Sequence, residues 1–85
     1  MRTLSVSALN EQIKGLLETS FSRVFVEGEL SRITFHSSGH IYFTLKDKNS
    51  AISCVMFRGN ASKLKFNLEE GLKVIIDGGI TLYKP

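Results

Sequence analysis

Residues 40–57, HIYFTLKDKNSAISCVMF, hold two runs in which apolar and polar side chains alternate, as they do in half-buried strands. In the first run the inward set is Ile41, Phe43 and Leu45, and the outward set is His40, Tyr42, Thr44 and Lys46. In the second run the inward set is Ile52, Cys54 and Met56, and the outward set is Ser53, Val55 and Phe57. The polar segment 47–50, DKNS, is rich in residues that hydrogen-bond their own backbone, so the two runs predict a β-hairpin.

Longer strands are predicted on both sides of this hairpin. Residues 23–33, RVFVEGELSRI, alternate with a period of two, and Gly28 allows a bend or a close backbone approach. Residues 31–40, SRITFHSSGH, are expected to form the loop that leads into the hairpin. Residues 72–83, LKVIIDGGITLY, predict a second long strand with a bulge or a sharp coil at its central glycine pair.

Two helices are also predicted. Apolar residues recur at spacings of three and four between Ser5 and Ser20, which gives one stripe that we interpret as a packing face. The hydroxyl of Ser5 or Ser7 is expected to cap the start of this helix. Asn60 is expected to cap a short helix over residues 61–66.

The order of these elements predicts a mainly β protein: an OB-fold barrel, the five-stranded oligonucleotide/oligosaccharide-binding barrel, with an N-terminal helix and a short helix between its third and fourth strands. We assign residues 1–20 to the helix and residues 21–85 to the barrel. Four of the five strands are visible. We therefore expect the chain to be the front of a longer protein, with open strand edges through which copies could pair.

The composition is that of one small globular domain. The chain has 85 residues, 42% hydrophobic residues and a formal net charge of +3, and such a charge is compatible with an anionic partner. Cys54 is the single cysteine, so an internal disulfide is excluded and a small buried hydrophobe in a reducing compartment is expected. No stretch has the length and apolarity of a membrane span or a signal peptide, so we expect a cytoplasmic protein.

The two histidines, His36 and His40, raise the question of a metal site. A zinc site needs three or four ligands, and here one cysteine in another strand is the nearest further donor. We therefore expect no metal and no cofactor. We also find no arrangement of residues that indicates catalysis, so no catalytic residue is assigned.

A surface for nucleic acid is the alternative interpretation of the same region. Barrels of this type bind across their second and third strands, beside the loop between the first and second. Hydroxyls and free amides around Gly39 can donate to phosphates, outward aromatic rings can stack on bases, and arginine can bind phosphate with two bonds. The candidate nucleic-acid-binding residues are Arg32, Ser37, Ser38, Gly39, His40, Tyr42, Lys46, Phe57, Arg58 and Tyr83.

Some of these residues also have a purely structural interpretation. Tyr42 and Phe57 are neighbours across the predicted hairpin, and such aromatic pairs commonly only stabilise sheets. The N-terminal helix is a second candidate to cover Phe57. Lysines beside a turn, such as Lys46, are common on any surface.

Five segments of the chain resemble, in order and spacing, the N-terminal domain of the exodeoxyribonuclease VII large subunit: SVSALNEQIKGLLETSF, VEGELS, HSSGHIYFTLKD, CVMFRGNA and DGGITLYKP. One departure is Ala8, where the family often has the Glu of a capping box. The resemblance implies a single-stranded DNA-binding module. It also implies a parent enzyme of the bacterial cytoplasm that degrades single-stranded DNA to oligonucleotides, with small subunits bound through a region absent here.

Two other functions remain open from the residues themselves. One is an RNA-binding barrel, like the anticodon domains of some aminoacyl-tRNA synthetases. The other is a non-catalytic barrel that docks protein subunits through its open edge.

Overall fold

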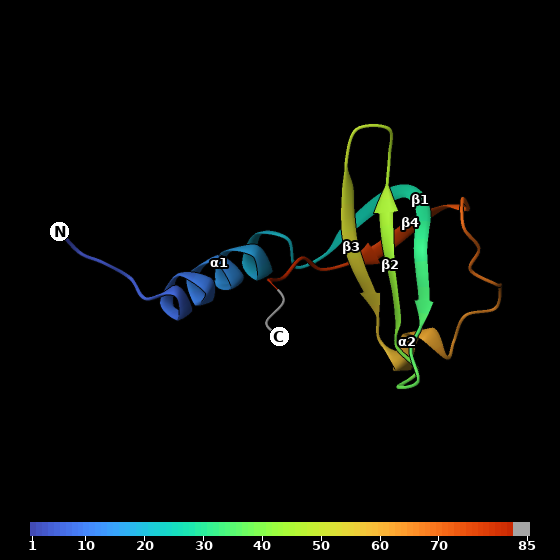
Figure 1. Cartoon of the computed structure of the whole chain (residues 1–85), viewed down its shortest axis with the longest axis horizontal. Coiled ribbons are helices and arrows are strands. Elements are labelled where there is room, and N and C mark those ends of the chain that lie inside the picture. Colours follow the sequence, from blue (N-terminus) through green and yellow to red (C-terminus); the bar gives the residue numbers. More distant parts are fainter. Residues whose placement is uncertain (83–85) are drawn as a thin grey trace. The chain divides into compact units, whose positions relative to one another are not determined.

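The structure is a computed structural model that describes residues 1–82. Its elements in chain order are α1 (Val6–Ser20), β1 (Val24–Phe35), β2 (Ile41–Lys46), β3 (Ala51–Met56), α2 (Arg58–Ala61) and β4 (Lys73–Gly78) (Figure 1). The strands form one four-stranded sheet in the order β3-β2-β1-β4. This confirms the predicted fold class: a mainly β domain of the OB type, with an N-terminal helix and a short helix after β3.

The chain divides into two compact units. The helix unit comprises Met1–Val26 and the chain from Ile76 on, and the sheet unit comprises Glu27–Ile75. The candidate site lies in the sheet unit, which is built around the hairpin.

The hairpin has the predicted turn and the predicted buried face on β2, whereas Ile52 of β3, which was predicted to face inward, is 46% exposed. β2 pairs antiparallel with β3, with Ile41 opposite Met56 and Lys46 opposite Ala51. One carboxylate oxygen of Asp47 accepts hydrogen bonds from the backbone amides of Asn49 and Ser50, both at 2.8 Å. These two bonds lower the pKa of Asp47, because they favour its charged form. The predicted self-bonded turn is thereby confirmed.

The buried core of the sheet unit comes from β1 and β2. Its members are Leu30, Ile41, Phe43 and Leu45. An ideal Cβ on Gly28 would lie 2.7 Å from Cγ of Leu45 and 3.0 Å from the carbonyl oxygen of Lys46. Gly28 therefore allows β1 to approach β2 closely, as predicted for this position.

The first strand is longer than predicted, and the loop after it is correspondingly shorter. Strand β1 continues to Phe35, which pairs with Ile41, so only residues 36–40 connect β1 to β2. The pairing register shifts between Ser31 and Thr34, where Arg32 adopts a positive φ of 52°. Such a bulge lets a strand continue past an unpaired residue. The predicted loop over residues 31–40 is therefore wrong for residues 31–35.

A carboxylate stabilises this bulge. The two carboxylate oxygens of Glu70 accept the backbone amides of Arg32 at 2.9 Å and Ile33 at 3.0 Å. The bonds from Ile33 and Arg32 hold the pKa of Glu70 below its usual range. Two amides that the register shift leaves without strand partners thus gain an acceptor from the segment before β4.

We expect the variant Glu70→Gln to lose less stability than the wild type as the pH falls. The pKa of Glu70 is lower in the folded state than in the unfolded state, where it is about 4.3. The Glu70 carboxylate therefore contributes stability above the unfolded pKa, and this contribution is lost as the pH falls through the folded pKa. Asp47 and Asp77, whose pKa values are also lowered, contribute stability in the same way. The fall in the free energy of unfolding at low pH should therefore be smaller in the variant, but not absent. Urea unfolding at a series of pH values measures this, and identical pH profiles for both proteins would contradict it.

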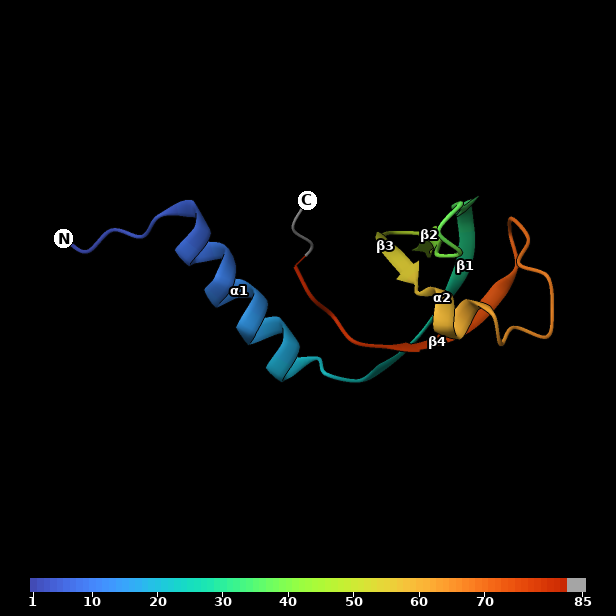
Figure 2. The ribbon, with the colours of Figure 1, turned by 90° about the horizontal axis from the view of Figure 1, so that it is seen from below.

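Two further elements begin or end at other residues than predicted. Helix α2 spans Arg58–Ala61 and follows Phe57, which makes no side-chain cap bond, so the predicted helix over residues 61–66 with an Asn60 cap is wrong. Strand β4 spans Lys73–Gly78, so the predicted strand over residues 72–83 does not continue through residues 79–82. Seen from below, the segment between α2 and β4 loops out beside the sheet (Figure 2).

Within the helix unit, the backbone at Gly79 lies close to the segment before β1. An ideal Cβ on Gly79 would lie 2.9 Å from the carbonyl oxygen of Ser22, and the amide of Ile80 donates to the carbonyl of Phe21 at 2.9 Å. Nearby, Arg23 and Asp77 form an exposed ion pair with a shortest N–O distance of 2.9 Å. The chain after Gly78 is thus held by the segment before β1.

Helix α1 begins as predicted, but its apolar stripe is exposed. The hydroxyl of Ser5 accepts the amide of Ala8 at 3.0 Å, which confirms the Ser5 cap. No residue of α1 is buried, and Leu16 is 69% exposed. Within residues 1–82 the apolar stripe of α1 is therefore not the buried packing face that the sequence predicted. None of the helices within residues 1–82 has the length and apolar character required to span a membrane.

Candidate functional site

The turn that joins β1 to β2 is closed by its own hydrogen bonds. The amide of His36 donates to the carbonyl of His40 at 3.0 Å, and the amide of Gly39 donates to the carbonyl of His36 at 2.9 Å. The amide of Ser38 donates to Nδ1 of His36 at 3.0 Å, and the amide of His40 donates to the hydroxyl of Ser38 at 3.3 Å. Gly39 adopts a φ of 92°, which glycine tolerates without strain.

These bonds correct one part of the sequence interpretation. We expected free amides around Gly39 to donate to phosphate oxygens, but the amides of Ser38, Gly39 and His40 already have acceptors inside the turn. The hydroxyl of Ser38 also lies 2.8 Å from Nδ1 of His36. Ser37 is exposed, and its hydroxyl is the group of this turn that remains a candidate phosphate donor.

His40 connects the turn to the end of β3. Its ring nitrogen Nδ1 accepts the backbone amide of Arg58 at 2.8 Å. The same ring meets the ring of Phe57 edge to face, with centroids 5.4 Å apart and planes at 90°. The His40 side chain therefore lies against the protein, and it is not a free group at the surface.

The two outward aromatic rings each pair with a histidine. Tyr42 lies opposite Val55 in the sheet rather than opposite Phe57, and its ring meets the ring of His36 edge to face at 5.9 Å. The residue is 39% exposed, and Phe57 is 60% exposed. Both rings thus keep accessible surface.

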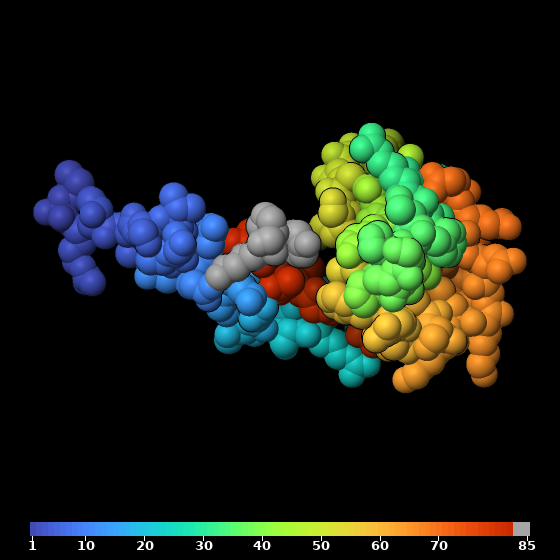
Figure 3. Space-filling model, turned by 60° about the horizontal axis from the view of Figure 1, so that its bottom comes forward, coloured from blue at the N-terminus to red at the C-terminus, as the bar shows by residue number. Residues whose placement is uncertain are grey.

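Arg58 lies where the turn and the hairpin end meet. An ideal Cβ on Gly39 would lie 2.8 Å from Cγ of Arg58 and 3.0 Å from its Cδ, so the arginine stem runs across the glycine. In the space-filling view the green surface of residues 36–40 adjoins the orange surface of α2 (Figure 3). One end of the hairpin therefore presents two aromatic rings, a guanidinium and the Ser37 hydroxyl. We call this end, with the turn residues that support it, the hairpin-end cluster: Ser37, Ser38, Gly39, His40, Tyr42, Phe57 and Arg58.

Two predicted cations lie outside this cluster. Lys46 is at the opposite end of β2, roughly 16 Å from Ile41 at about 3.3 Å per residue. Its charge contributes to the lowered pKa of Glu70, so Lys46 and the Glu70 carboxylate are near one another. The same carboxylate binds the amide of Arg32. An acidic group beside both residues reduces the attraction that they offer to a polyanion.

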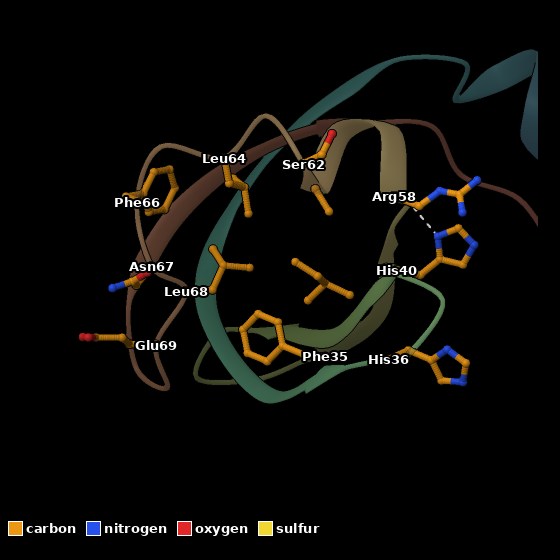
Figure 4. A pocket seen from close by; sticks show the side chains of 13 residues that line it. Phe35, His36, His40, Arg58, Ser62, Leu64, Phe66, Asn67, Leu68 and Glu69 are labelled. Atoms are coloured by element: carbon orange, nitrogen blue, oxygen red, sulfur yellow. Dashed lines mark hydrogen bonds between the residues drawn. The ribbon is translucent and has the colours of Figure 1, made fainter.

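A hollow of about 710 Å³ adjoins the cluster, whose residues Gly39, His40 and Arg58 form part of its lining, and no pattern in the sequence indicated it. Phe35, Leu64 and Leu68 point into this hollow, whereas His36, His40 and Arg58 lie at its side (Figure 4). Phe35 was predicted to lie in the loop over residues 31–40, so the sequence did not indicate that its side chain lines this hollow. The hollow is largely apolar in its lining, so the groups suited to phosphate lie on its rim.

The described residues do not gather a metal site or an activated thiol. Within residues 1–82, no three side chains of His, Cys, Asp or Glu lie close enough together to hold a metal ion. Cys54 is half-buried, and burial raises the pKa of its thiol, which favours the protonated form over the nucleophilic thiolate. Tyr83, the remaining candidate residue, lies outside the described residues.

Known proteins resemble this chain along its whole length. It is 80% identical over 85 residues to the exodeoxyribonuclease 7 large subunit of Sulfurimonas denitrificans, and 56% identical to that of a Nitratiruptor species. The Helicobacter hepaticus protein of the same name is 53% identical. In each case all of this chain is matched, but it spans only 20% of the length of the relative.

The family model for an OB-fold nucleic acid binding domain matches residues 4–85, which is nearly the entire chain. This match agrees with the four-stranded sheet and its short helix after β3. By fold and by sequence, the chain belongs to the family of OB-fold nucleic acid binding domains.

Proposed function

We propose that this chain binds single-stranded DNA through the hairpin-end cluster. The observation that carries the proposal is the joint placement of two accessible aromatic rings and one guanidinium at the same end of the hairpin. Aromatic rings stack on unpaired bases for about 1–3 kcal/mol per base, and a neighbouring cation follows the phosphate backbone. A duplex keeps its base faces stacked on one another and cannot use these rings.

DNA is the proposed polynucleotide because the relatives are named exodeoxyribonuclease large subunits. Stacking and phosphate contacts make little distinction between base sequences, which suits binding to DNA of any sequence. We propose further that the longer protein is a cytoplasmic nuclease with small subunits, and that residues 21–85 form its DNA-binding barrel. The catalytic groups of such an enzyme would lie in other segments.

Replacing Arg58 by alanine should weaken binding to single-stranded DNA about tenfold, since hydrogen bonds to charged groups contribute about 1.5–3 kcal/mol. The loss should be similar for all base sequences, and the salt dependence of binding should become shallower by roughly one phosphate contact. Fluorescence anisotropy with a labelled oligothymidylate of about 12 nucleotides, titrated at several salt concentrations, measures both quantities.

Arg2→Ala is the matched control for this measurement, because it removes the same charge from an exposed arginine ahead of α1. An equal loss in both variants would show attraction to net charge alone. Equal affinity of the wild type for duplex and single-stranded DNA would contradict stacking on unpaired bases. Tighter binding to structured RNA would favour an RNA-binding barrel instead, and no binding to any polynucleotide would favour a protein-docking role.

A further inference from the structure

We infer that His40 is a positioning residue that holds Phe57 and Arg58 in place for the polynucleotide, rather than a residue that contacts it. The inference rests on the proposed function, and it gives His40 a supporting role in place of the direct DNA contact predicted from the sequence. One imidazole ring touches two consecutive residues of the hairpin-end cluster, through a hydrogen bond to one and a ring contact to the other.

The hydrogen bond fixes the chemistry of the imidazole. Nδ1 of His40 accepts the amide of Arg58 at 2.8 Å, so this nitrogen carries a lone pair and not a proton. The first amides of a helix have no partner within it, and Arg58 is the first residue of α2. Phe57, which precedes the helix, makes no side-chain cap bond. His40 therefore supplies the acceptor that the local sequence lacks.

The ring contact restrains the preceding residue. The ring of His40 meets that of Phe57 edge to face at 5.4 Å, while the phenylalanine remains 60% exposed. The contact restrains the phenyl ring and leaves the greater part of the side chain accessible. A ring restrained before binding loses less freedom when a base stacks on it.

Gly39 completes the support from the other side. The Arg58 stem runs across this glycine at distances that a Cβ would not permit, and the φ of 92° at Gly39 also favours glycine. The backbone of Arg58 is thus held by His40, and its methylene groups lie against Gly39. Both supports come from the turn 36–40, so that turn sets the direction of the guanidinium.

Two substitutions of His40 separate the hydrogen bond from the rest of the side chain. Asn places its Oδ1 as many bonds from the backbone as Nδ1 of histidine, so His40→Asn retains an acceptor for the Arg58 amide. Gln places its terminal atoms one bond further out, so His40→Gln does not. Both variants lose the ring, which makes each the control for the other.

Amide hydrogen exchange of the free 85-residue chain is the first measurement. We expect the exchange of the Arg58 amide to be slowed to a similar extent in the wild type and His40→Asn, and to be about fivefold faster or more in His40→Gln. The Leu30 and Phe43 amides report whether each variant is folded. Equal exchange of the Arg58 amide in all three folded proteins would overturn the inference, and this readout does not depend on DNA binding.

Affinity for the oligothymidylate is the second measurement. His40→Asn should bind about fivefold more tightly than His40→Gln. In an Arg58→Ala, Phe57→Ala background, the further change His40→Gln should leave affinity unchanged within about twofold, because the residues that it positions are gone. A full additional loss in that background would show that His40 contacts DNA directly. If the wild type binds no DNA while the exchange result holds, the proposed function fails and the support of Arg58 by His40 stands.

Discussion

Replacing Leu30 by alanine is expected to lower the free energy of unfolding by about 3 kcal/mol, within the 2–5 kcal/mol range for buried leucines. Leu30 is 1% exposed and lies in a core that contains only three other buried side chains among the described residues. A domain of this size has a total stability of only about 4–13 kcal/mol. A single cavity at this position should therefore remove a large part of it. Urea unfolding followed by circular dichroism measures the change.

Leu16→Ala is the matched control, because the same side chain is shortened on the exposed stripe of α1. Its effect should stay within about 0.5 kcal/mol. Equal losses for both variants would mean that the stripe of α1 is buried in solution. A negligible loss for Leu30→Ala would contradict the core described above.

Removing both outward rings together, in the double variant Tyr42→Ala, Phe57→Ala, should weaken binding to single-stranded DNA about 100-fold. Each stacked base contributes about 1–3 kcal/mol, so two rings together account for the largest expected change in affinity. Both side chains are accessible, at 39% and 60% exposure, so the variant should remain folded. Anisotropy titration of the same oligothymidylate measures the loss.

Phe66→Ala controls for aromatic loss elsewhere in the sheet unit. Phe66 is an exposed phenylalanine that lines the apolar hollow rather than the hairpin face. Affinity should change by less than about twofold, because this ring has no role in the proposed stacking. A larger loss for Phe66→Ala than for the double variant would place the bases in the hollow.

The parts of the fold that could be predicted are those determined by neighbouring residues. The alternation in residues 41–56 places Ile41, Phe43 and Leu45 in the core, and the Asp47 turn bonds to its own backbone. Both properties depend on spacing along one short segment, which the sequence displays directly. The Ser5 cap was predictable for the same reason.

The parts that could not be predicted depend on residues far apart in the chain. The length of β1 depends on the bulge at Arg32, whose amide is bonded by Glu70 from 38 positions away. Alternation alone gave no indication that a distant carboxylate would satisfy these amides. The close approach of Gly79 to Ser22, 57 positions away, likewise gives no signal in either segment alone.

The candidate site shows the same division. Tyr42 was correctly placed on the outward face of β2, since a strand alternates with a period of two, and Phe57, which follows β3, is exposed. The support of Arg58 by His40 spans 18 positions and joins a turn to a helix that was predicted to begin later. Sequence patterns identify which residue types lie on a face, but not which of them restrain one another.

Chemical-shift mapping during titration with oligothymidylate tests the central claim most directly. We expect the largest shifts at Tyr42, Phe57, Arg58 and the turn 36–40, with weaker ones at Lys46 on the opposite end of β2. Shifts centred on the hollow residues Leu64, Phe66 and Leu68, or none within the sheet unit, would contradict binding of single-stranded DNA at the hairpin end.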